Sequence, residues 1–138
     1  MASQASRFLF LFVLGLLLGA VATVIAMRWL QARQDPFPHS VMQVMARQTD
    51  VLKQNLTTNR CTTSDAVPRL QTLRSVGNDL ETAFPDLAED QRFVTHASQL
   101  RATLDGGLSA PPVGCPDTKA TLAKVEEACE ACHKDFGD

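Results

Sequence analysis

The sequence has little of what a β-sheet protein needs. It contains no tyrosine, one tryptophan, seven glycines and seven prolines among its 138 residues. No segment alternates apolar and polar residues as a half-buried strand does. Because sandwiches and barrels depend on many short strands joined by turn residues, this composition argues against an all-β fold. We therefore expect an all-α protein.

An excess of basic charge is also absent. The formal net charge is −2, and the chain after residue 30 keeps all 15 acidic residues but loses Arg7 and Arg28, which makes it −4. Non-specific nucleic-acid binding needs a basic surface, so we expect no nucleic-acid partner. The length allows one domain of ordinary size, too little for an anchored nucleotide-binding enzyme. No acid–base or nucleophile–base pair stands out, and we predict that the chain is not an enzyme.

The longest apolar run lies near the N-terminus. Residues 8–27 carry no charge, and a helix of about 20 residues crosses the roughly 30 Å of a bilayer's hydrocarbon core. Arg7 and Arg28 flank the run, so we predict a single-pass membrane anchor over residues 1–30, inserted through residues 8–30. The alternative is a signal peptide cleaved near Ala20-Val21-Ala22, which would remove residues 1–22, although such apolar regions are typically shorter.

The remaining chain carries four helical patterns. Residues 31–38 contain two prolines and predict a linker. Apolar residues then recur at three- and four-residue spacing, which predicts helices over about 39–57, 64–84, 86–105 and 116–136. Amphipathic helices of this length joined by short connections predict an antiparallel four-helix bundle over residues 39–138.

Several residues suggest where these helices begin and end. Ser64 or Asp65 could cap the second helix. Asp86, with Glu89 three residues later, has the spacing of a capping box for the third. Gly106 and Gly107 are expected to end the third helix, since glycine is the commonest residue just past a helix C-terminus.

One motif carries specific chemistry. Cys129-Glu130-Ala131-Cys132-His133 is C-x-x-C-H, the attachment signature of c-type haem. The two thiols form thioethers to the two vinyl groups of the porphyrin, and the adjacent His133 reaches the iron as the proximal ligand. The alternative is a redox C-x-x-C, but that motif follows a strand and starts a helix. We predict one covalent haem c. Phe136 lies on the same apolar face of the predicted helix as the two cysteines, and we expect it to lie beside the haem.

The other two cysteines are expected to pair with each other. In an up-down-up-down bundle, Cys61 after the first helix and Cys115 before the fourth meet at one end, about 20 Å from the C-x-x-C pair. Their disulfide would close a loop of about 55 residues and contribute about 4 kcal/mol. The alternatives are two free thiols or a four-cysteine zinc site. Disulfides and attached haem both require assembly outside the bacterial cytoplasm, which places the domain in the periplasm, anchored to the inner membrane.

The same topology brings the start of the first helix to the haem. His39, Met42 and Met45 are spaced by three and share a face. Met42 is our candidate for the second axial ligand, Met45 for a wall of the distal pocket, and His39 for a propionate contact or a helix cap. The alternative is that both methionines simply fill the core. His96 falls in the middle of the third predicted helix, two turns from the haem, and is expected to be a partly exposed surface residue.

Taken together, residues 37–136 resemble the cytochrome c prime superfamily, whose four-helix bundles carry C-x-x-C-H on the last helix. The resemblance puts Met42 at the position that faces the iron, which holds a Met ligand in the low-spin branch and a non-ligating apolar residue in the high-spin branch. No Arg precedes Met42 in this helix, as one does in the family, so either His39 takes that role or no residue does. The anchor and the Cys61–Cys115 pair are atypical. Many family members dimerise, which leaves a homodimer open.

Three functions are compatible with these features. The first is a membrane-tethered electron carrier with redox protein partners, such as a quinol-oxidising complex and a terminal oxidase. His/Met ligation suits electron transfer, a tether raises local concentration, and an acidic surface steers the domain toward basic partners. The second is a five-coordinate protein that binds NO or CO. The third is an accessory haem subunit of a respiratory complex.

Overall fold

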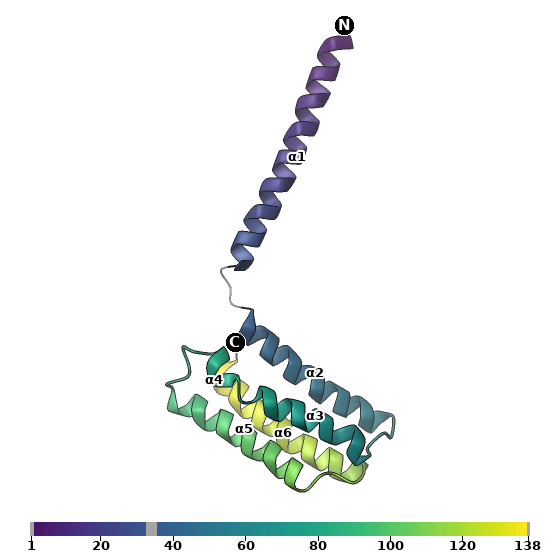
Figure 1. Ribbon diagram of the computed structural model, residues 1–138, viewed down its shortest axis with the longest axis vertical. Coiled ribbons are helices and arrows are strands. Elements are labelled where there is room, and N and C mark those ends of the chain that lie inside the picture. Colours follow the sequence, from purple (N-terminus) through teal and green to yellow (C-terminus); the bar gives the residue numbers. More distant parts are fainter. Residues whose placement is uncertain (1, 33–35, 138) are drawn as a thin grey trace. The chain divides into compact units, whose positions relative to one another are not determined.

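The chain is entirely helical in the residues that the structure describes. The computed structural model describes residues 2–32 and 36–137, with side chains from 7 to 29 and from 36 onward. These form six helices and no strand: α1 (Ala2–Ala32), α2 (Phe37–Thr57), α3 (Thr63–Val76), α4 (Leu80–Ala83), α5 (Gln91–Ser109) and α6 (Cys115–Phe136) (Figure 1). The predicted all-α class is confirmed. Residues 33–35 of the predicted linker lie outside the described residues.

The chain divides into two compact units, Met1–Pro36 and Phe37–Asp138. The first unit contains α1, in which the segment Arg7–Trp29 is 23 residues long and apolar enough to cross a membrane. Every side chain of that segment is exposed. A helix that is apolar on all sides is typical of a membrane span, and an N-terminal signal sequence has the same character.

In the second unit, four long helices pack side by side. α2 contacts α3 and α6, while α5 contacts α3 and α6, and the short α4 touches α2 and α5 (Figure 1). Each long helix turns one apolar stripe inward, as its 3.6-residue period requires. The largest fully buried side chains are Leu52, Leu70, Leu73, Leu104 and Val125.

The second predicted helix is divided in two. α3 ends at Val76, and α4 begins only at Leu80. Arg101 of α5 stabilises this break: its guanidinium donates to the carbonyl of Gly77 at 3.0 Å and to both carboxylate oxygens of Glu81 at 2.8 and 3.0 Å. These hydrogen bonds lower the pKa of the Glu81 carboxyl. The prediction of a continuous helix was wrong because a residue from a different helix satisfies the backbone at the interruption.

Two helices begin at caps that differ from the predicted ones. At α3 the cap is Thr62, whose hydroxyl accepts from the backbone N–H of Asp65 while the Asp65 carboxylate accepts from the backbone N–H of Thr62. At α5 the cap is Asp90, whose carboxylate accepts from the N–H of Arg92 at 2.8 Å. The predicted capping box from Asp86 is therefore wrong, because Asp90 is the acceptor next to the apolar stripe of α5.

The expected end of the third predicted helix is also wrong. α5 continues through Gly106 and Gly107 to Ser109. Gly107 is buried, and a Cβ there would lie 2.9 Å from Thr121 Cγ2 of α6 and 3.5 Å from Leu70 Cδ1 of α3. The glycine is thus a point of close approach between helices rather than a cap. At Gly106 a Cβ would meet nothing within 4 Å.

These two neighbouring glycines form a matched pair for a packing test. Gly107→Ala should destabilise the domain relative to Gly106→Ala by about 1–3 kcal/mol, because the added methyl overlaps Thr121 and forces α5 and α6 apart. Gly106→Ala should be neutral or should stabilise by about 0.5–1 kcal/mol through helix propensity alone. Urea unfolding of the full chain in detergent measures both. Equal stabilities of the two variants would contradict the close approach at Gly107.

Candidate functional site

The C-x-x-C-H motif lies in the last two turns of α6. Cys129 and Cys132 are free, partly buried thiols on one face, and His133 follows as an exposed residue. The helix ends at Phe136, and the backbone N–H of Gly137 donates to the carbonyl of His133 at 2.7 Å. The three residues of the predicted attachment motif therefore share one short, regular piece of backbone.

Two cavities adjoin this motif, and both are lined by Met42 of α2 together with Cys132 and His133 of α6. The first, of about 450 Å³, is lined by aromatic side chains from α5, from α6 and from the residue that follows α4. The second, of about 640 Å³, is also lined by Cys129. Both volumes lie in the range of small-molecule and cofactor sites. The further apolar walls are Phe84, Phe93 and Phe136 in the first cavity, and Met45, Leu80 and Leu100 in the second.

This set of side chains has the composition that a covalently attached haem requires. Two thiols spaced by three residues, an imidazole beside the second thiol, and a thioether on the facing helix all line cavities with largely apolar walls. Imidazole and thioether are the axial ligands of many c-type haems. The apolar part of the lining would pack against the porphyrin ring. The residues present therefore fit the group.

The other predicted site residues take different positions. Met45 is 6% exposed, belongs to the apolar core and also lines the second cavity. Phe136 lines the first cavity. His39 is the third residue of α2, its ring Nε2 lies 2.9 Å from Gln43 Nε2, and it lines neither cavity. Its suggested contact with a propionate remains a prediction.

The predicted partial exposure of His96 is confirmed, since 17% of its side chain is exposed, but its predicted position in the middle of the helix is wrong. Because α5 begins at Gln91 rather than near Asp86, His96 lies in its second turn, beside the end of α6. Its Nε2 is 3.1 Å from Asp135 Oδ2, and its ring centroid is 6.1 Å from that of Phe136. Asp90 lies directly before the apolar stripe of α5 and is the better cap. Choosing it would have moved the predicted start of the helix and placed His96 near that start.

The surroundings of the two motif thiols favour their protonated form. Burial raises the pKa of the Cys129 thiol, with smaller contributions from Cys132 and Glu126. Burial likewise raises the pKa of Cys132, with a contribution from Asp135. A redox C-x-x-C lowers the pKa of its nucleophile, usually at a helix N-terminus. This pair lies near a helix C-terminus, where the helix dipole disfavours a thiolate, so the arrangement argues against a thiol–disulfide catalyst.

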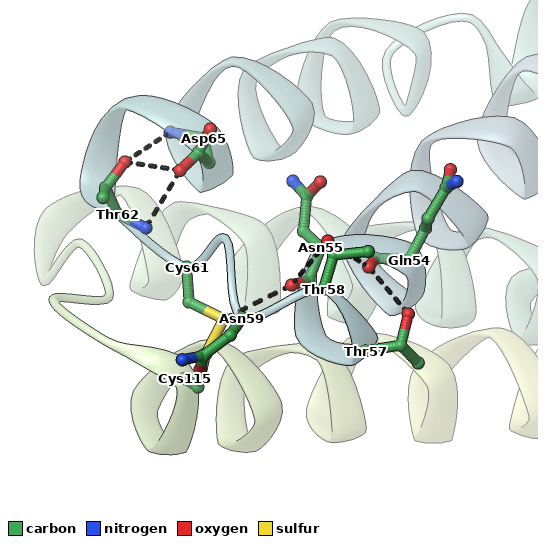
Figure 2. The surroundings of a disulfide bond; sticks show 9 residues. All are labelled: Gln54, Asn55, Thr57, Thr58, Asn59, Cys61, Thr62, Asp65 and Cys115. Atoms are coloured by element: carbon green, nitrogen blue, oxygen red, sulfur yellow. Dashed lines mark hydrogen bonds between the residues drawn. A yellow bond between two sulfur atoms is a disulfide. The ribbon is translucent and has the colours of Figure 1, made fainter.

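The remaining cysteines lie at disulfide-bonding distance, as predicted. Cys61 and Cys115 have an S–S separation of 2.02 Å and a Cα–Cα separation of 4.9 Å. Figure 2 shows the bond joining the α2–α3 connection to the first residue of α6. Asn59 allows the chain to turn there, because its φ of 57° is left-handed. The backbone N–H of Arg60 then donates to the carbonyl of Asn55 at 2.8 Å.

The four cysteines thus form two separate pairs. Along α6, Cys115 and Cys129 are separated by about 20 Å of helical rise. Within residues 2–32 and 36–137, no group of three or more His, Cys, Asp or Glu side chains has the arrangement of a metal site. The four-cysteine zinc alternative therefore has no support in the described part of the chain.

Comparisons with protein-family models, with curated proteins and with solved structures found no match to this chain.

Removing the disulfide should destabilise the domain without disturbing the cavities. The bond joins residues 54 positions apart, and the chain-entropy model gives such a cross-link about 4 kcal/mol. We expect the double variant Cys61→Ser, Cys115→Ser to have a free energy of unfolding lower by about 4 kcal/mol, measured by urea unfolding. Dithiothreitol should lower the stability of the wild-type chain similarly and leave the double variant unchanged. Insensitivity of the wild-type chain to dithiothreitol would mean that the two thiols are free.

Proposed function

We propose that this chain is a membrane-anchored c-type cytochrome that carries electrons at the periplasmic face of a bacterial inner membrane, between a quinol-oxidising complex and a terminal oxidase. The observation that carries the proposal is the convergence of Cys132 and His133 of α6 with Met42 of α2 around two adjoining cavities. Cys129, which completes the C-x-x-C-H spacing, lines the larger one.

In this proposal each side chain has a defined task. Cys129 and Cys132 would hold the haem through thioether bonds, and His133 and Met42 would bind its iron. When bound, the haem supplies a one-electron couple at its iron. The buried Met45 keeps water from the distal side, which favours the less charged reduced state and raises the potential. No side chain of the site changes covalently during electron transfer.

The surrounding fold supports the assignment to a bundle of the cytochrome c prime type. α2, α3, α5 and α6 pack in neighbouring pairs, which is the neighbour relation of an antiparallel four-helix bundle. The apolar α1 supports a membrane anchor, and a tethered domain meets membrane-bound partners at a high effective concentration. The charge of −4 after residue 30 would steer the domain toward basic docking surfaces.

A gas-binding protein is the second candidate, because one observation favours it. The first cavity has apolar aromatic walls and reaches both Met42 and His133. If Met42 lines that cavity without binding the iron, the iron is five-coordinate and NO or CO can enter beside it. The spin state of the iron distinguishes the two candidates.

Covalent haem attachment is the first test. The full chain, produced in a bacterial periplasm with the c-type maturation machinery, should carry one haem per chain in a pyridine haemochrome assay and by intact mass. Cys129→Ser and Cys132→Ser should lose one thioether each, and the double variant should lose the covalent haem. Cys61→Ser is the matched control, since its sulfur belongs to the distant pair, and it should retain the haem. A wild-type chain that remains free of haem would overturn the proposal.

The identity of the second axial ligand is the next test. The ferric wild-type protein should be low-spin in its optical and EPR spectra, and Met42→Ala should convert it to high-spin because the thioether is lost. Met45→Ala is the control: it enlarges the second cavity and should leave the iron low-spin. A high-spin wild-type protein that binds CO or NO without displacing a ligand would favour the gas-binding candidate.

A further inference from the structure

Side chains from the first turns of α5 enclose the last turn of α6. The ring of Phe136 meets that of Phe93 edge-on, with centroids 5.6 Å apart and an interplanar angle of 90°. It meets the His96 ring at 6.1 Å and 81°, and the Arg92 guanidinium carbon lies 5.2 Å from its centroid. Phe136 is therefore held by three side chains of one helix. Edge-on ring pairs and cation–π contacts of this kind each contribute to stability beyond their buried area.

A hydrogen bond reinforces this contact at the neighbouring residue. His96 Nε2 lies 3.1 Å from Asp135 Oδ2, and because an ionised carboxylate only accepts, Nε2 is the donor. Only 17% of the His96 side chain is exposed, and its Nδ1 is buried with no hydrogen-bond partner among the described residues. A ring that leaves one nitrogen unsatisfied carries a desolvation cost. The ring orientation is therefore set by Asp135 and Phe136 and not by the hydrogen-bonding needs of His96 itself.

The segment that these residues hold directly follows His133. The final turn of a helix lacks the onward hydrogen bonds of its interior and opens most easily. Here the carbonyl of His133 accepts from the backbone N–H of Gly137, so movement of residues 135–137 also moves the peptide of His133. Fixing Asp135 and Phe136 against α5 consequently fixes the backbone from which the His133 imidazole extends.

We propose that His96 is a positioning residue for His133, acting through Asp135 and Phe136. The inference rests on the proposed role of His133 as the proximal iron ligand. His96 lines neither cavity, and it reaches the site only through Asp135 and through Phe136, which lines the first cavity. Outer partners that orient metal-binding histidines are typically worth about 10–100-fold in metal affinity or activity. The contacts of His96 with Asp135 and Phe136, which we call the clamp, would act on the backbone of His133 rather than on its second ring nitrogen.

Three variants of the full-length, haem-loaded protein in detergent test the clamp. His96→Leu removes the hydrogen bond, and His96→Gln keeps a side-chain donor for Asp135. Arg74→Gln is the control, because it breaks a comparable contact between helices away from α6, in which Arg74 Nε of α3 donates to Asp105 Oδ1 of α5 at 2.6 Å. Asp135→Ala repeats the test from the other side if His96→Leu fails to fold.

The measurements are the ferric EPR spectrum, which reports the orientation of the axial ligands, and amide hydrogen exchange. In the ferric EPR spectrum, His96→Leu should replace the single set of g-values of the wild-type protein by a broadened or second set. It should also raise the rate of amide hydrogen exchange about tenfold, in residues 133–137 only. His96→Gln should restore the wild-type spectrum, and Arg74→Gln should leave it unchanged. If His96→Leu gives the wild-type EPR spectrum in a loaded protein, the clamp is overturned while haem attachment stands. If the wild-type protein carries no haem, the proposed function fails, and the exchange of residues 133–137 still tests the contact.

Discussion

The packing of α6 between α2 and α5 is the constraint on which the rest of the structure depends. On one side, α6 presents Cys132 and His133 to cavities that Met42 of α2 also lines. On the other, Gly107 of α5 faces Thr121 with no room for a side chain. Since a packed interior transmits small displacements, the spacing of α5 and α6 at that glycine affects the alignment of the two helices along their whole length.

The domain keeps its four cysteines as two separate pairs, one bonded and one free. The disulfide joins the start of α6 to the α2–α3 connection, whereas the C-x-x-C-H motif occupies the last turns of the same helix. Between them lie buried apolar side chains such as Leu122 and Val125. This separation keeps the two free thiols about 20 Å of helical rise away from the bonded pair, which hinders exchange between them. The raised pKa of Cys129 and Cys132 further slows their reaction with a disulfide, which requires a thiolate.

Much of the helical structure was predictable, and the errors have identifiable causes. The 3.6-residue periodicity located every long helix because that signal is local. The start of α5 was misplaced because Asp86 and Asp90 both resemble caps, and only the packing of the helix selects Asp90. Gly106 and Gly107 were taken for a helix end, although the buried Gly107 serves contact with α6. The break after Val76 escaped prediction because Arg101, from a different helix, stabilises it.

The sequence by itself determined the all-helical class, the apolar N-terminal helix and the C-x-x-C-H motif. Each of these depends on residue order over a few helical turns, through periodicity or covalent spacing. The topology of successive helices also sufficed to pair Cys61 with Cys115. Only the tertiary structure decided which side chains surround the motif. His96 and Asp135 are 39 residues apart, and they meet because Gly107 and the apolar stripes set how α5 lies on α6. No local pattern encodes that relation, since it is a property of two surfaces and not of either segment.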